Sequence, residues 1–416
     1  MELVEVETKI TDKRIWPLLL QAPVIVAALG YFVDIYDLLL FSIVRISSLQ
    51  GIGVASTNMM RDGILLINVQ MIGLLLGGIL WGILGDKKGR LSVLFGSILI
   101  YSVANIMNGM VTSITQYAIL RFVAGVGLAG ELGAGITLVA EILPKKVRGY
   151  GTAMVASVGL LGAVLAYFVA KYFDWRTTYY IGGGLGMLLL LLRISVAESH
   201  LYQATQQAKV EKGNILVLFT SAKRFFKYIR CIAIGLPIWF VIGILITFSP
   251  ELSHAMGLSF TASSGTAVMY CYIGMAIGDI SSGLVSQYLN SRKKAVALFM
   301  AFTIISIALY LTFSSASSTY FYAICLVGGF SIGFWAMFVT IAAEQFGTNL
   351  RSTVATTVPN FVRGAVVPLT YFFQQLGTAT NLVTSAWIVG LVTLALAALA
   401  LWQMEETFGK DLNYTE

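Results

Sequence analysis

Long apolar segments alternate with short polar loops along almost the whole of this chain of 416 residues. Each apolar segment has about 20 residues or more, which is enough for a helix to cross ~30 Å of hydrocarbon. We predict twelve membrane-spanning helices, at about residues 17–44, 63–84, 91–111, 115–142, 151–173, 178–196, 228–250, 260–284, 295–314, 318–346, 353–376 and 382–403. The pattern therefore indicates an all-α membrane protein.

The polar stretch 197–227 is the longest connection and divides the predicted helices into two sets of six. We predict a first bundle over residues 1–196, an interdomain loop over 197–227 and a second bundle over 228–416. The segment FTSAKRFFKYIR, residues 219–230, is basic and amphipathic. We expect this segment to lie on the membrane surface.

Composition and charge agree with this interpretation. Only 11% of the residues are charged, against roughly 25% in soluble domains. The net charge of +7 does not indicate a nucleic-acid partner, because the basic residues gather in the termini and in loops on one side. The positive-inside rule places both termini and the 197–227 loop in the cytoplasm of a bacterial-type inner membrane. Arg121 and Arg363 are the two basic residues expected inside spans, whereas Arg45 is assigned to an outer loop.

The second half of the chain repeats the first at an offset of 203 residues, so that Gly125 corresponds to Gly328 and Gly130 to Gly333. Glu141 corresponds in the same way to Glu344, and Arg148 to Arg351. A parallel repeat within an apolar chain is typical of secondary transporters built from two related bundles.

Several motifs strengthen this expectation. The loop after the second predicted helix reads GILGDKKGR, residues 82–90, and the fourth helix reads RFVAGVGLAGE, residues 121–131, followed by EILPKKVRG at 141–149. These motifs resemble the major facilitator superfamily, and in particular its sugar-porter and metabolite:proton-symporter branches. Glu198-Ser199 and the run from Glu406 to Lys410 also match, although Ala197 and Glu405 replace prolines of the family pattern. The resemblance implies two pseudo-symmetric six-helix bundles around a site at the membrane midplane.

The resemblance also implies a set of gating residues at the cytoplasmic side. These are Asp86, Arg90, Glu141, Arg148, Glu344 and Arg351. Asp86, the acid of the loop motif, is expected to stabilise the closed gate. The pairs Glu141–Arg148 and Glu344–Arg351 are expected to hold helix ends together. A static scaffold for the loops is the alternative.

Charged residues inside predicted spans are costly and usually functional. Six stand out in this sequence: Asp34, Asp37, Arg121, Glu131, Asp279 and Arg363. Asp37 and Arg121 fall at similar depths, about 10 Å from the outer surface, so we predict that they pair. Tyr36-Asp37 also resembles the Tyr-Asp of proton-coupled sugar porters. We expect Asp34, Asp37, Arg121 and Glu131 to carry proton coupling, with a permanently paired structural network as the alternative.

The predicted helix 353–376 carries one polar stripe. It contains Asn360, Arg363, Thr370 or Tyr371, and Gln374. Arg363 falls near the bilayer centre, where Asp279, another acid or the substrate must neutralise it. The planar guanidinium group of Arg363 can donate two hydrogen bonds at once to a carboxylate or phosphate. Further candidates for the substrate pocket are Tyr36, Gln70, Trp239 and Trp335, each of which packing alone also explains.

Together these features predict a proton-coupled symporter that takes up a small organic anion by alternating access. A carrier of a zwitterionic or cationic solute, or a drug-efflux carrier, is one alternative, and a non-transporting sensor is another. We expect a monomer in the lipid bilayer, with protons as the coupling ion and without cofactor, metal, nucleic-acid partner or enzymatic activity. The cysteines Cys231, Cys271 and Cys325 do not have the spacing of a metal site, and we expect them to be small buried hydrophobic residues.

Overall fold

The computed structural model describes residues 15–88, 90–143, 145–197, 218–312, 317–347 and 350–410. Within these ranges the chain forms α-helices joined by short turns, with short 3₁₀ segments, one π-helix and no strand. The all-α fold class predicted from the apolar pattern is therefore confirmed.

The first half of the chain forms the helices that we call the N-terminal bundle. They are α1 (Ile15–Leu19), α2 (Ala22–Gly51), α3 (Met59–Lys88), α4 (Arg90–Asn108), α5 (Ile114–Leu128), α6 (Glu131–Ile142), α7 (Lys145–Leu160), α8 (Gly162–Tyr172) and α9 (Trp175–Ala197). The 3₁₀ turn η3 (Ser56–Asn58) lies between α2 and α3.

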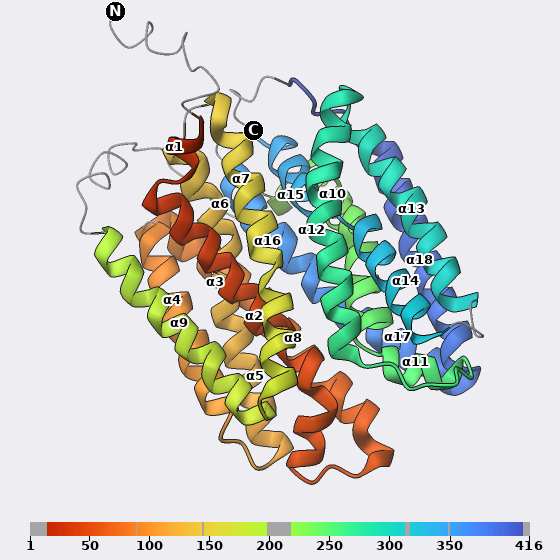
Figure 1. Cartoon of the computed structure of the whole chain (residues 1–416). Coiled ribbons are helices and arrows are strands. Elements are labelled where there is room, and N and C mark those ends of the chain that lie inside the picture. Colours follow the sequence, from red (N-terminus) through yellow and green to blue (C-terminus); the bar gives the residue numbers. More distant parts are fainter. Residues whose placement is uncertain are drawn as a thin grey trace, which may run out of the picture.

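The second half forms the C-terminal bundle. Its elements are α10 (Ala222–Phe240), the π-helix η6 (Val241–Ile246), α11 (Ser249–Ala255), α12 (Ser264–Tyr288), α13 (Arg292–Thr312), α14 (Ser318–Ser331), α15 (Trp335–Glu344), α16 (Arg351–Gly364), α17 (Val366–Ala379) and α18 (Leu382–Gln403). The two bundles stand side by side in Figure 1, from red to yellow-green and from green to blue.

Every predicted span corresponds to one helix or to consecutive helical segments. In the described part of the chain, nine helical segments are long and apolar enough to cross a membrane, and Ser92–Asn108 is a shorter apolar helix. The spans predicted at 115–142, 151–173, 318–346 and 353–376 are each interrupted, which the apolar pattern did not reveal.

The interruptions follow the internal repeat. The break between α5 and α6 lies at Ala129–Gly130, and the break between α14 and α15 includes Ile332 and Gly333, 203 residues later. Leu161 separates α7 from α8, and Ala365, 204 residues later, separates α16 from α17. The two halves thus share the positions of their helix breaks as well as their helices.

Glycines on α3 allow close packing on two of its faces. A Cβ atom on Gly77 would lie 2.8 Å from the Cα atom of Val126 in α5, within the N-terminal bundle. A Cβ atom on Gly78 would lie 2.9 Å from the side chain of Asn360 in α16, across the bundle interface. Small residues permit such backbone approach within a membrane, so α3 can hold its own bundle and the partner bundle at once.

Helix α16 bridges the two bundles, because it packs against both α3 and α6. Helix α12 forms a second bridge to α2, α7 and α8. Figure 1 shows α1 and the end of α18 at the same end of the molecule, which we call the terminal side; the opposite end is the distal side. The positive-inside rule predicts that the terminal side is cytoplasmic.

Candidate functional site

A buried ion pair joins the two bundles. The Nη2 atom of Arg363, in α16, lies 3.8 Å from Oδ2 of Asp34, in α2, and both side chains are almost completely buried. This distance allows an ion pair but is too long for a good hydrogen bond. Arg363 was expected near the bilayer centre, and Asp34 is the acid that the structure brings to it.

The break between α16 and α17 lies directly after Arg363. Arg363 lies in the last turn of α16, which ends at Gly364 before α17 begins at Val366. The carbonyl groups at the end of a helix carry partial negative charge, which stabilises a cation there. The interruption of the eleventh predicted span therefore supplies part of the environment that keeps this guanidinium charged.

Two indole rings flank the guanidinium group. The Cζ atom of Arg363 lies 5.6 Å from the ring centroid of Trp335 and 6.0 Å from that of Trp239. Trp239 follows Pro237 inside α10, just before the π-helix η6. Proline removes a backbone hydrogen bond and π-helices often mark functional sites, so the chain is already irregular where Trp239 enters the site.

We call Arg363, Asp34, Trp239 and Trp335 the central site. Several hydrogen-bond donors in it have no protein acceptor among the described residues. They include Nε and Nη2 of Arg363 and Nε1 of Trp239. Buried polar groups are normally hydrogen-bonded, because an unpaired donor costs about 1–3 kcal/mol. The convergence of unpaired donors around one cation favours an anionic ligand with acceptor oxygens.

Asn360 and Thr370 precede and follow Arg363 in the chain, and they contact the α5–α6 break and α3 of the N-terminal bundle. The Nδ2 atom of Asn360 donates to the carbonyl of Ala129 at 2.9 Å, and Thr370 Oγ1 donates to Asn68 Oδ1 at 2.7 Å. Of the alternatives Thr370 and Tyr371, the structure therefore directs Thr370 inward. Tyr371 is 56% exposed, and Gln374 is half-buried.

Glu131 forms a buried ion pair with Arg193, in α9. Both Arg193 Nη atoms donate to the carboxylate, Nη1 to Oε2 at 3.1 Å. Arg193 was not among the charged residues expected inside spans, yet its side chain is only 4% exposed. The signal available in the sequence was its position inside the predicted span 178–196.

Asp37 and Arg121 were predicted to pair, and the structure gives them different neighbours. Arg121 donates to Gln70 and, at 3.4 Å, to the hydroxyl of Tyr179. Its guanidinium also lies 4.7 Å from the ring centroid of Phe41. Among the described residues, no ion pair within 4 Å joins Asp37 to Arg121, although both are fully buried.

Two further candidates have local structural contacts. Tyr36 donates its hydroxyl hydrogen to the carbonyl of Thr178 at 3.0 Å, within the N-terminal bundle. Asp279 accepts a hydrogen bond from the backbone N–H of Ala336 at 2.8 Å. Ala336 lies in the first turn of α15, where an acid stabilises the exposed N–H groups, so Asp279 caps the interrupted helix.

An unpredicted ion pair closes the distal side. Arg45 lies inside α2 and is fully buried, in contrast to its predicted place in an outer loop. Its Nη2 atom lies 2.7 Å from Oε1 of Glu251 in α11, and its guanidinium lies 4.8 Å from the Phe248 ring centroid. The pair joins the two bundles on the side opposite to the termini.

The predicted gate at the terminal side is described only in its second half. Glu344 pairs with Arg292 at 3.3 Å, and Arg351 begins α16. The side chains of Asp86, Arg90, Glu141 and Arg148 lie outside the described residues. The gating roles therefore stay predictions.

The described residues contain no group of three or more His, Cys, Asp or Glu side chains that could hold a metal ion. Cys231, Cys271 and Cys325 are buried and free.

Comparisons with known proteins agree with this architecture. The family model of the Major Facilitator Superfamily matches residues 24–381. The chain is 28% identical to a putative metabolite transport protein of Haemophilus influenzae, over 88% of this chain and 93% of that protein. It is 27% identical to the niacin transporter NiaP of Acinetobacter baylyi, over 84% and 86% of the two chains. It is 25% identical to the sialic acid transporter NanX of Escherichia coli, over 88% and 91%.

Proposed function

The chain belongs to the major facilitator superfamily of transporters, and we propose that it is a proton-coupled symporter for a small organic anion. Substrate uptake would proceed by alternating access, with the two bundles rocking around the central site. The predicted location is a bacterial-type inner membrane, with both termini in the cytoplasm.

The observation that carries this proposal is the environment of Arg363. Its guanidinium is 1% exposed, lies between two bundles and two indole rings, and retains unpaired N–H groups. A carboxylate can bind two guanidinium N–H groups at once, which gives both energy and orientation. The names of two relatives support the same class, since niacin and sialic acid are carboxylic acids.

The Asp34–Arg363 pair suggests how a proton is coupled to the anion. A substrate carboxylate that binds Arg363 takes over the charge that neutralises Asp34 in this structure. A buried carboxylate without its counter-ion is strongly disfavoured, because the membrane interior solvates charge poorly. Asp34 therefore binds a proton as the anion binds Arg363, and both leave together when the site opens to the other side.

The N-terminal bundle contains further groups for the proton path. Asp37 lies one helical turn from Asp34 on α2, and Glu131 is held by Arg193. Gly30 of α2 lies against this second pair, because a Cβ atom on it would meet the side chains of Glu131 and Arg193. Any rotation of α2 would therefore affect both acidic sites, which supports their joint role in coupling.

A screen with matched ligands tests the proposed substrate class. The purified carrier would be heated in detergent with nicotinate or benzoate, and in parallel with nicotinamide or benzamide as neutral controls. A ligand that binds the folded state raises the melting temperature by mass action. We expect carboxylates to raise the melting temperature more than their amides do; stabilisation only by sugars, zwitterions or cations would contradict the anion proposal.

Uptake into proteoliposomes then tests coupling. A labelled carboxylate identified in the screen should accumulate when the outside is more acidic than the inside. Accumulation that is unaffected by collapsing the proton gradient would contradict proton symport.

A further inference from the structure

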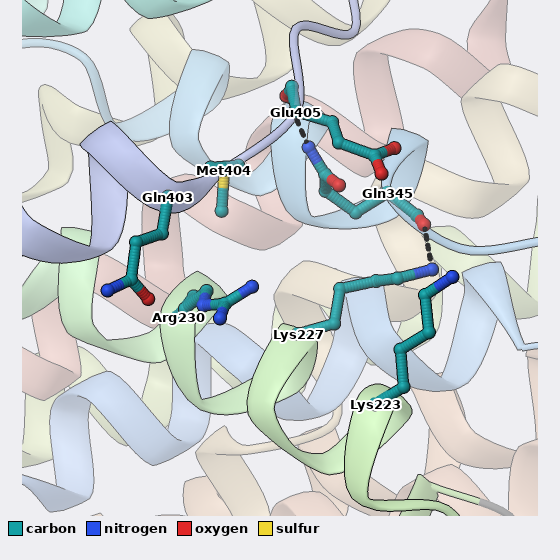
Figure 2. Close-up of a pocket in the computed structure, with 7 residues that line it drawn as sticks. All are labelled: Lys223, Lys227, Arg230, Gln345, Gln403, Met404 and Glu405. Carbon is teal, nitrogen blue, oxygen red and sulfur yellow. Dashed lines mark hydrogen bonds between the residues drawn. The ribbon is translucent and has the colours of Figure 1, made fainter.

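A small pocket opens on the terminal side, at the start of α10 (Figure 2). Lys223, Lys227 and Arg230 form one wall, and their spacing of four and three residues places them on one face of α10. Gln345 and residues 403–405 form the opposite wall. The cavity volume is about 60 Å³, which is room for a phosphate-sized group.

Hydrogen bonds fix the walls of this basic pocket. Lys227 Nζ donates to the backbone carbonyl of Gln345 at 3.1 Å, and Gln345 Nε2 donates to the carbonyl of Glu405 at 2.7 Å. Figure 2 shows both contacts and shows the Lys223 and Lys227 side chains extending towards Gln345. The starting turn of α10 is thus tied to the ends of α15 and α18.

The basic pocket has an excess of positive charge. Among the described residues, no acid lies within 4 Å of Lys223 or Arg230, whereas the carboxylate of Glu405 lies 3.4 Å from Lys410 Nζ. Arg230 is half-buried, so its charge is partly withdrawn from water. Three cationic side chains thus line the pocket against the single carboxylate of Glu405, which is already paired with Lys410, so the net charge favours entry of an anion.

Exposed aromatic and aliphatic side chains place the pocket at the membrane interface. Trp402, directly before the pocket residues 403–405, is 77% exposed. Phe226 and Ile229, on the neighbouring face of α10, are 57% and 41% exposed. Tryptophan concentrates at the level of lipid headgroups, whereas exposed apolar residues on a membrane helix contact acyl chains. The pocket therefore opens where the phosphate of a lipid would lie.

We propose that the basic pocket binds the phosphate group of an anionic phospholipid. Lys223 and Arg230 donate to the phosphate oxygens, while an acyl chain runs along Phe226 and Ile229. The bound lipid would link α10 to the ends of α15 and α18, close to the Arg292–Glu344 pair. This inference does not depend on the substrate of the transporter.

Native mass spectrometry and thermal stability of the purified carrier test the proposal with three additives: phosphatidylglycerol, phosphatidylcholine and inorganic phosphate. We expect phosphatidylglycerol to bind and to raise the melting temperature more than the other two. The double variant Lys223→Gln with Arg230→Gln should weaken phosphatidylglycerol binding by about fivefold for each charge removed, since basic residues near an anionic surface contribute additively.

The matched control is Arg224→Gln with Lys294→Gln, which removes the same charge without altering a residue that lines the pocket. This control should bind phosphatidylglycerol as the wild type does. Equal weakening in both double variants would overturn the pocket in favour of a general charge effect. Stabilisation by inorganic phosphate without stabilisation by phosphatidylglycerol would overturn the lipid in favour of a free anion.

Discussion

The two bundles share a skeleton and differ in what they bury. Among the described residues, the N-terminal bundle buries seven charged side chains: Asp34, Asp37, Arg45, Asp62, Arg121, Glu131 and Arg193. The C-terminal bundle buries two, Asp279 and Arg363. One half of the interior is therefore rich in charged side chains, and the other half is largely apolar and aromatic.

Corresponding positions make this contrast concrete. At the 203-residue offset, Asp34 corresponds to Pro237, Tyr36 to Trp239 and Asp37 to Phe240. Arg121 corresponds to Ile324, and Glu131 to Phe334. Where the first half places a charge, the second half has an apolar side chain or a helix-distorting proline. The comparison suggests that the N-terminal bundle handles the proton and the C-terminal bundle shapes the site for the anion.

The largest expected effect is on the Glu131–Arg193 pair. Replacing Glu131 with Gln leaves the buried Arg193 charge without its partner, which should lower the free energy of unfolding by about 3–5 kcal/mol. Equilibrium unfolding in mixed micelles measures this loss. The double variant Glu131→Gln with Arg193→Leu should recover part of it, because no buried charge remains unpaired. A single variant as stable as the wild type would show that the pair does not support the fold.

A smaller effect is expected from Arg363→Ala on ligand binding. Loss of the guanidinium should weaken binding of a carboxylate by about 3 kcal/mol, or about a hundredfold in Kd, because a buried charged partner is lost. Titration calorimetry with benzoate measures the change, and benzamide serves as the neutral comparison ligand. Arg363→Lys should retain part of the affinity through its charge. An equal loss for benzoate and benzamide would make Arg363 a purely structural residue.

The next effect concerns the distal closure. Glu251→Gln removes the charge partner of Arg45 and should favour distal opening by about 1–2 kcal/mol. A cysteine introduced at Ser42, whose hydroxyl accepts from Thr247 at 3.3 Å, reports this opening through its rate of thiol labelling. Arg61→Gln is the control, because Arg61 pairs with Asp62 within α3. Labelling at the same rate in the Glu251 variant and the wild type would show that the pair is not a gate.

The smallest effect arises outside the membrane, at Glu406. Burial disfavours its ionised form, but hydrogen bonds from Ser291 and from the backbone N–H groups of Phe408, Arg292 and Lys293 outweigh this and lower its pKa to about 2. Since the folded-state pKa is lowered, its stabilising contribution is present above the ordinary pKa of about 4.5 and is lost as the pH falls through about 2.

Glu406→Gln should therefore destabilise the carrier at pH 6 by less than about 1 kcal/mol, because the carboxylate is partly exposed to water. Melting temperatures from pH 6 down to pH 3 should show the difference between variant and wild type shrinking below about pH 4.5. A difference that stays constant over this range would exclude a contribution from the ionised carboxylate.

The sequence was sufficient for the span positions and for the internal repeat, because both depend on hydropathy and spacing. It was insufficient for the pairing of buried charges. Depth along a helix indicated that Asp37 and Arg121 lie at one height, but it does not determine which way each side chain points. Arg363 was therefore correctly expected to be buried, while its partner, Asp34, was one of several possible acids.

Charged residues near the ends of spans were the other source of error. A hydropathy window ends where charge begins, so Arg45 was assigned to a loop and Arg193 was not named among the charges inside spans, although both are buried in helices. Their partners, Glu251 and Glu131, lie 206 and 62 residues away in the chain. Only the packing of the helices reveals that these residues belong to the candidate site and the distal closure.

The central claim is that Asp34 couples the proton to an anion held by Arg363. It is tested most directly by comparing wild type and Asp34→Asn in proteoliposomes, with exchange and gradient-driven accumulation of one labelled carboxylate measured side by side. We predict that Asp34→Asn retains exchange and loses accumulation, because Arg363 still binds the anion but no proton follows it. Accumulation at the wild-type ratio, or loss of exchange together with accumulation, would contradict this account.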